Sequence, residues 1–350
     1  MSEAAEGYRT AEQRIRRKKG MFFFCMVSPL SCRDQSCGLW YTRYAMKKRL
    51  HPVVALALCA LLWSFGGLMI KLIQWDMLAI ASIRSFFGMV VVSLVFRRLP
   101  RFTVRREDGS VDGANTVNLL LGGAFYAATM LLFVPATKLT TAANAILLQY
   151  TNPVYIILFG PILLKEKNDW IDYMAVAGIM GGMLLLLGGD LDFAHMDGEK
   201  MLGNLLALGS GVTYGFTTIF LRRQKDGHPA DSLNLSNLLA FVVALPFVVK
   251  SGVPSVMSCV GLVVLGVFQI GIPASLLALG IAGVPALSSV IITMIEPMMN
   301  PVWVALFVGE VPSVSAIVGG VLILLFIVAH VVLKARKAIH EQRRIGNKLA

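Results

Sequence analysis

Glu296 is a carboxylic acid near the middle of an apolar segment, residues 285–310, that is long enough to cross a lipid bilayer. A charged side chain at the centre of such a helix costs about 3 kcal/mol, so residues of this kind usually face a cavity and lie on the path of a substrate or ion. At about 100° per residue, one narrow helix face collects the acid together with other polar side chains. These are Ser289, Thr293 and Asn300. The segment therefore predicts a polar path on an otherwise lipid-compatible helix.

The depth of Glu296 limits what the acid can do. It lies about 12 residues from either end of its segment, or roughly 18 Å, so its carboxylate does not reach the headgroups. A proton, a basic partner or a bound substrate has to neutralise it. Pro297 lacks an amide proton and frees a carbonyl near Thr293, one turn back. Two roles stay open: binding a substrate cation or coupling proton, and donating a hydrogen bond that only holds helices together.

The segment around Glu296 has an earlier copy in the chain. Residues 141–166 align without a gap on residues 285–310. The polar face is duplicated, although its residues differ. Four pairs of positions carry the correspondence: Pro153 with Pro297, Glu166 with Glu310, Gln149 with Thr293, and Asn152 with Glu296. The chain is therefore predicted to consist of two copies of one unit, whose Asn152 and Glu296 face each other across a pseudo-two-fold axis.

The composition identifies the class of protein that positions these residues. The chain is 56% hydrophobic and 15% charged, with a mean hydropathy of +0.71, whereas soluble domains carry about 25% charged residues. Continuous apolar runs of about 20 residues exclude a β-barrel, which needs alternation. Ten spans are predicted: 53–73, 77–96, 116–136, 140–163, 170–188, 201–221, 232–249, 256–279, 284–308 and 313–334.

The number of spans sets the topology. Five spans per copy is an odd number, so the second copy enters the bilayer from the opposite side. We therefore expect an all-α polytopic membrane protein with ten transmembrane helices as two inverted five-helix repeats. Met46 begins a sequence that would suit the start of an inner-membrane protein, so the native start is left open. The predicted parts are a disordered basic tail (1–45), a first repeat (46–189), a second repeat (190–334) and a basic cytoplasmic tail (335–350).

The net charge of +12 is explained by membrane orientation, without a nucleic-acid partner. Most of the 32 Lys and Arg residues fall on one side of the predicted spans, which is the bias of cytoplasmic loops. Both termini are therefore expected in the cytoplasm. The five cysteines and five histidines show no metal-ligand spacing, so no metal or other cofactor is expected.

The duplication extends to other spans of each half. Trp63 and Lys71 lie on one helix face, and Tyr214 and Arg222 repeat their spacing in the second copy. The third span contains Tyr126 and Thr129, and its mate in the second copy contains Gln269 and Ser275.

For three charged residues the sequence allows a simple structural explanation as well as a functional one. Arg84 lies inside the second span, and its long side chain either snorkels to the outer interface or faces a cavity. Glu166 and Glu310 lie at helix ends, where solvation by water is a sufficient account.

Four stretches resemble the drug/metabolite transporter superfamily, EamA family: ALLWSFGGLMIK, LAIASIRSFFG, AILLQYTNPVYIILFGPILLKE and SSVIITMIEPMMNPVWVALFVGE. The resemblance covers about residues 51–334 and implies a ten-helix fold of two inverted repeats in a bacterial cytoplasmic (inner) membrane. It also implies a central cavity lined by spans one, three, four, six, eight and nine, with export of amino acids or related metabolites as the usual activity. The recurrent family positions are Arg84, Pro153, Glu166, Glu296, Pro297 and Glu310, for which packing and transport both stay open.

The sequence thus predicts a multi-pass secondary transporter of small polar metabolites that works by alternating access, and not an enzyme. A membrane-embedded enzyme and a non-transporting membrane subunit are the alternatives. The expected partners are a small-molecule substrate and membrane lipid, and a coupling proton and a monomeric state are compatible with the pattern. No catalytic residue or metal site is expected. The predicted substrate-binding residues are Glu296, Thr293, Asn152, Gln149, Trp63, Tyr214, Tyr126 and Gln269.

Overall fold

The computed structural model describes residues 50–349 of the chain, except 107, 188–197, 226–227 and 309–313. The predicted tail, residues 1–45, and Glu310 lie outside this part of the chain, as does the side chain of Asn300. Within the described residues every regular element is a helix, and one isolated bridge pairs Arg105 with Val111. These helices belong to one compact unit, Pro52–Ala350.

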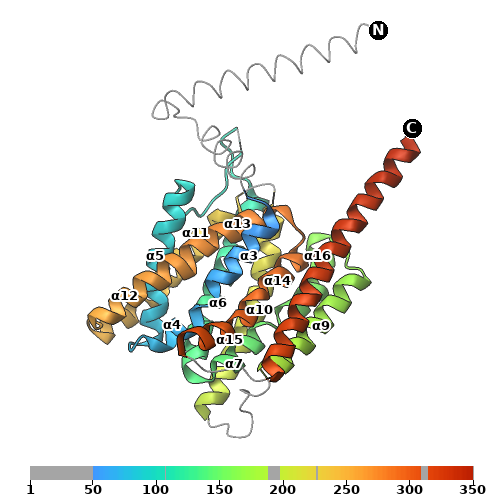
Figure 1. The fold of residues 1–350 in the computed structure, drawn as a ribbon. Coiled ribbons are helices and arrows are strands. Elements are labelled where there is room, and N and C mark those ends of the chain that lie inside the picture. Colours follow the sequence, from blue (N-terminus) through green and yellow to red (C-terminus); the bar gives the residue numbers. More distant parts are fainter. Residues whose placement is uncertain (1–49, 107, 188–197, 226–227, 309–313, 350) are drawn as a thin grey trace. The chain divides into compact units, whose positions relative to one another are not determined.

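The first five predicted spans correspond to seven helices, because two of the spans are broken (Figure 1). The first span is α3 and α4, and the fourth is α7 and α8. The bounds are α3 (Pro52–Trp63), α4 (Gly66–Leu72), α5 (Met77–Phe96), α6 (Gly113–Leu139), α7 (Ala142–Gln149), α8 (Asn152–Leu164) and α9 (Trp170–Leu187).

The second five spans follow the same plan. The eighth span contains a π-helix, η2, between two α-helices, and the ninth is broken into α14 and α15. The bounds are α10 (Gly198–Arg223), α11 (Pro229–Ser251), α12 (Val256–Val264), η2 (Leu265–Gly271), α13 (Ile272–Gly283), α14 (Ala286–Thr293), α15 (Ile295–Val308) and α16 (Val314–Leu349).

The prediction of a polytopic all-helical fold is confirmed. Eight spans of the described chain are long and apolar enough to cross a membrane, judged by length and composition. Two shorter apolar helices, Trp170–Leu186 and Ala286–Met299, take the places of the predicted fifth and ninth spans. The connections from α6 to α7 and from α13 to α14 are two residues long, so each of these helix pairs forms a tight hairpin.

Helix packing follows the duplication. α5 packs against α11, and α9 packs against α16, so each of these pairs joins equivalent helices of the two repeats (Figure 1). α6 packs against α10, and α13 packs against α3. α6 and α13 belong to equivalent spans of the two repeats, and so do α10 and α3. Exchanging the repeats therefore turns the pair α6–α10 into the pair α13–α3. The contacts therefore have the pseudo-two-fold relation expected of inverted repeats.

Short polar side chains begin several spans. Asp76 accepts hydrogen bonds from the N–H groups of Leu78 and Ala79 at the start of α5, both at 2.9 Å. Thr141 accepts one from the Asn144 N–H at 3.1 Å at the start of α7. Each such cap contributes about 1 kcal/mol to a helix. The caps satisfy N–H groups that have no partner within the helix, so they help to fix where the spans begin.

The fourth and ninth spans break at duplicated positions, where the sequence predicts continuous helices. α7 ends at Gln149 before Pro153, and α14 ends at Thr293 before Pro297. Proline lacks the amide proton that would bond to the carbonyl one turn back, so both breaks have the same cause. The hydroxyl of Tyr150 lies 3.2 Å from the Thr293 carbonyl oxygen, the acceptor that Pro297 leaves free. Broken helices of this kind surround substrate sites in many transporters.

Candidate functional site

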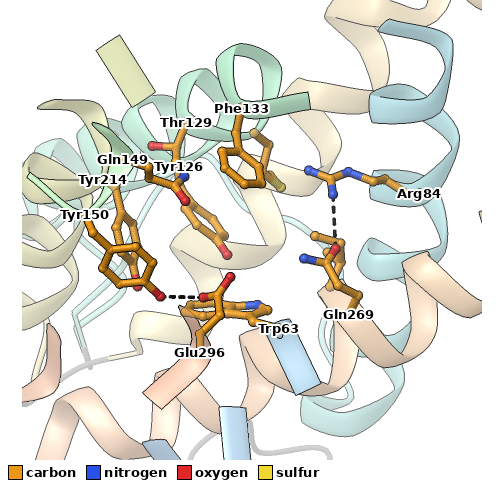
Figure 2. Close-up of a pocket in the computed structure, with 12 residues that line it drawn as sticks. Trp63, Arg84, Tyr126, Thr129, Phe133, Gln149, Tyr150, Tyr214, Gln269 and Glu296 are labelled. Atoms are coloured by element: carbon orange, nitrogen blue, oxygen red, sulfur yellow. Dashed lines mark hydrogen bonds between the residues drawn. The ribbon is translucent and has the colours of Figure 1, made fainter. Parts of the chain in front are cut away.

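A cavity of about 50 Å³ lies between helices of both repeats, at the level of the two helix breaks (Figure 2). This volume holds one or two water molecules. The lining comes from seven of the ten spans. It consists of Trp63 (α3), Arg84 (α5), Tyr126, Thr129, Met130 and Phe133 (α6), Gln149 (α7), Tyr150 (between α7 and α8), Tyr214 (α10), Gln269 and Ile270 (η2), and Glu296 (α15).

Glu296 forms the acidic end of the cavity. The Tyr150 hydroxyl donates a hydrogen bond to its Oε2 atom at 2.6 Å, as Figure 2 shows. Glu296 is the second residue of α15, and Tyr150 lies in the break between α7 and α8. The two broken spans thus meet at this contact. A carboxylate held at one oxygen keeps its other oxygen available to a cation or a proton.

Arg84 forms the basic end of the same cavity. Its side chain is 2% exposed, and its Nη1 atom donates to Gln269 Oε1 at 3.1 Å (Figure 2). Its Nε atom has no hydrogen-bond partner among the described residues. The sequence left two positions open for the Arg84 side chain, at the outer interface or in a cavity. The first of these is therefore wrong. The resemblance did not imply a contribution from the second span, and Arg84 supplies one.

Close packing of α5 against η2 brings Arg84 to Gln269. A Cβ atom on Gly266 would lie 2.8 Å from the Arg84 carbonyl oxygen, so only glycine allows this approach. The π-helix has a wider turn than an α-helix, and such turns occur often at functional sites.

Aromatic rings fill the space between the two charged ends. The ring centroids of Trp63 and Tyr214 are 6.1 Å apart, and those of Tyr126 and Tyr214 are 6.3 Å apart. All three side chains are buried. They present an apolar wall with hydroxyl groups, which suits the carbon skeleton of a small polar molecule.

Six of the eight predicted site residues line this cavity together: Trp63, Tyr126, Gln149, Tyr214, Gln269 and Glu296. The other two are not among the lining residues. The Thr293 hydroxyl donates to the Val290 carbonyl in its own helix at 2.9 Å. Asn152 is fully buried, and both polar atoms of its side chain lack a hydrogen-bond partner in the described part of the chain.

Six lining residues lie outside the predicted substrate-binding set. Tyr150 is the most informative of them because it binds the central acid. An aromatic residue in an apolar run carries no signal of its own, but the neighbouring Pro153 does mark the break that turns Tyr150 inward. The remaining lining residues outside the predicted set are Arg84, Thr129, Met130, Phe133 and Ile270.

Glu166 links three helix ends rather than being solvated alone, which corrects the simple explanation given by the sequence. Its Oε1 atom accepts from Arg222 Nε at 2.7 Å, and its Oε2 atom accepts from the Ala286 N–H at the start of α14 at 3.0 Å. Arg222 also donates to the carbonyls of Ile281 and Ala282 at the end of α13. We call this group the Glu166–Arg222 bridge.

A second cavity, of about 240 Å³, adjoins the bridge between α8, α9, α14 and α16. Its charged lining includes Asp172 and Lys334, whose Oδ2 and Nζ atoms are 2.7 Å apart. Nearby, partial burial opposes the charge of Asp169, but hydrogen bonds from Lys337 and Lys334 outweigh it and hold the pKa of that carboxyl well below its usual range. These pairs therefore stay formed at mildly acidic pH and tie α9 to α16.

In the described part of the chain, no group of three or more His, Cys, Asp or Glu side chains could hold a metal ion.

Comparison with known proteins finds a family model and named relatives that match this chain. The model of the EamA-like transporter family matches residues 51–188 and 201–331, which are the two repeats. A protein named "Uncharacterized transporter" from Archaeoglobus fulgidus is 26% identical over 273 residues, which is 77% of this chain and 92% of that protein. Solute carrier family 35 member G1 of Homo sapiens is 28% identical over 217 residues, 59% of this chain and 56% of that protein. The match thus spans only about half of the human protein.

A solved crystal structure shares the fold. It is 16% identical, covers 81% of this chain and 97% of its own, and has a TM-score of 0.65.

Proposed function

We propose, because the chain belongs to the EamA-like transporter family, that it is a secondary transporter of small zwitterionic metabolites. Amino acids or related compounds are the substrates, and the protein exports them across a bacterial cytoplasmic membrane by alternating access. The relatives that carry a functional name are called transporters or solute carriers, which favours transport over catalysis.

One observation carries the choice of substrate: a buried cation, Arg84, and an acid, Glu296, line the same cavity. A zwitterion brings a carboxylate for the guanidinium and an ammonium group for the acid. It adds no net charge to a site where an unpaired charge would be costly. A simple anion would leave Glu296 without a cationic partner, and a simple cation would leave Arg84 without an anionic one. The aromatic wall between them accommodates the carbon skeleton.

The duplicated architecture supports alternating access. The cavity of about 50 Å³ is too small for an amino acid, so helices must separate before a substrate enters. Inverted repeats with broken helices allow one central site to open to either face in turn. The Glu166–Arg222 bridge closes one end by linking α10, α13 and α14. A proton on Glu296 replaces the substrate ammonium in the empty carrier, which couples export to proton entry.

Uptake by the purified protein in liposomes tests this proposal. Liposomes loaded with unlabelled amino acids should take up labelled amino acid by exchange, and an imposed proton gradient should accelerate net movement. Protein-free liposomes are the control. Equal uptake with and without the protein, for every amino acid tried, would overturn the proposal.

The orientation can be tested separately, with both termini proposed to lie in the cytoplasm. A reporter that is active only in the cytoplasm should give signal when fused after Lys348, and a periplasm-active reporter should give signal after Lys200. Silence of both fusions would reverse the orientation.

A further inference from the structure

We infer, on the basis of the transport function proposed above, that Gln269 determines which substrate charge the site accepts. Its neutral amide holds the Arg84 guanidinium in place and leaves the positive charge available to a substrate carboxylate. A carboxylate at position 269 would neutralise Arg84 and change the preferred substrate from an amino acid to the corresponding amine.

The first step is that Arg84 is only partly satisfied. A guanidinium has five N–H donors and no acceptor. The described residues supply one hydrogen-bond partner, Gln269, and leave Nε without one. No carboxylate of the described chain forms an ion pair with this side chain, although it is 2% exposed. Buried donors of a charged group are rarely left unpaired, so this end of the cavity is prepared for an anionic group.

The second step concerns the direction of the Gln269 amide. Because Arg84 can only donate, it must face the amide oxygen, and the Nε2 donor must point elsewhere. Figure 2 shows the nitrogen of Gln269 turned away from Arg84. Guanidinium and amide together thus offer a substrate carboxylate two kinds of N–H donor. A glutamate at the same position would offer none.

The third step is that the fold fixes Gln269 in this position. Pro273 lacks the N–H that would bond to the Gln269 carbonyl in an α-helix, and the Ile272 N–H donates to Val267 across a π-turn. Gly66 leaves the space that the amide occupies. A Cβ atom there would lie 2.6 Å from Gln269 Nε2. The neighbouring Gly67 has no such contact within 4 Å.

Ligand-dependent thermal stabilisation of the purified full-length protein tests the inference. The probes are three matched pairs: alanine and ethylamine, leucine and isoamylamine, and phenylalanine and phenethylamine. Wild type should bind the amino acid of at least one pair about tenfold more tightly than its amine. Gln269→Glu keeps the side-chain size and should reverse the preference.

A second variant keeps the test decisive if Gln269→Glu does not fold. Gly66→Ala should displace the amide and weaken amino-acid binding about fivefold without favouring amines, whereas Gly67→Ala should bind like wild type. Unchanged preference in Gln269→Glu, or equal affinity in Gly66→Ala and Gly67→Ala, would overturn the role of Gln269 and leave the proposed function intact. If wild type binds none of the amino acids, the proposed function is contradicted, and so is the inference about Gln269 that rests on it.

Discussion

The two repeats break their central helices at the same place but put different side chains there. In the first repeat, Asn152 begins α8, is fully buried and has no side-chain partner among the described residues. In the second, Glu296 lines the cavity and binds Tyr150 of the first repeat. Duplication thus gives the two repeats nearly the same helix arrangement, and Glu296 gives only the second repeat an acid at this position. A symmetric pair of acids would repel, whereas one acid opposite one basic residue suits a zwitterion.

The ends of the repeats differ in a similar way. Arg222 binds Glu166 and two carbonyls, whereas Lys71, at the equivalent position, donates only to the Thr140 carbonyl in the described part of the chain, at 3.4 Å. The end at Arg222 is therefore held by more hydrogen bonds than the end at Lys71.

The largest effect is expected when the acid that distinguishes the second repeat loses its charge. Glu296→Gln should keep normal membrane abundance and lower the transport rate by about 30-fold or more, because a substrate ammonium loses its buried counter-charge. Uptake at several pH values measures this. Glu199→Gln, an exposed acid at the start of α10, is the matched control. Unchanged transport at every pH would remove Glu296 from the mechanism, and loss of folded protein would assign it a structural role.

A smaller effect is expected from the contact that joins the repeats at the acid. Tyr150→Phe removes the hydroxyl that lies 2.6 Å from Glu296 and should slow transport roughly three- to tenfold. The exposed Tyr173 on α9 provides the control substitution Tyr173→Phe. If the two variants transport equally well, the hydrogen bond contributes nothing to the cycle.

The difference between the two ends predicts that loosening the Glu166–Arg222 bridge changes how easily a water-soluble reagent reaches the adjoining cavity. Glu166→Gln should loosen the bridge, so that a cysteine placed at Ser288, in the adjoining cavity, reacts with a water-soluble maleimide about fivefold faster. The reaction rate in the Ser288→Cys protein with Glu166 intact is the reference. Equal rates would show that the bridge does not control access from this end.

The smallest effect is expected at the position that pairs with Glu296 by duplication. Asn152→Leu replaces a buried amide that has no side-chain partner among the described residues with an apolar group of similar size. The melting temperature should stay equal or rise, and transport should remain within about twofold of wild type. A loss as large as that of Glu296→Gln would mean that the two repeats contribute equally to the site.

Much of the fold could be predicted because hydropathy and duplication are strong signals. The aligned segments 141–166 and 285–310 identified the fourth and ninth spans, and in the structure these spans break just before Pro153 and Pro297. The breaks themselves were not predicted, since an interruption of one or two residues scarcely changes the mean hydropathy of a span. The π-helix at Gln269 was missed for the same reason.

Residues of the site could be predicted where a polar side chain in an apolar run is enough to identify them. Glu296, Gln149 and Gln269 stand out in apolar runs, and all three line the cavity. Polarity could not separate them from Thr293 and Asn152, which do not line it. The Thr293 hydroxyl donates within its own helix, and the Asn152 amide has no partner in the described part of the chain. The orientation of Arg84 required the structure as well, since its depth in the span was compatible with snorkelling.

The claim that the cavity binds both ends of a zwitterion is tested most directly by three ligands that differ only in their charged groups. Alanine carries both groups, ethylamine only the ammonium group, and propionate only the carboxylate. Competition with the labelled amino acid that the wild-type protein transports best should give clear inhibition by alanine, and inhibition at least about tenfold weaker by each of the other two. Equal inhibition by alanine and either single-charge ligand would contradict the pairing of Arg84 and Glu296.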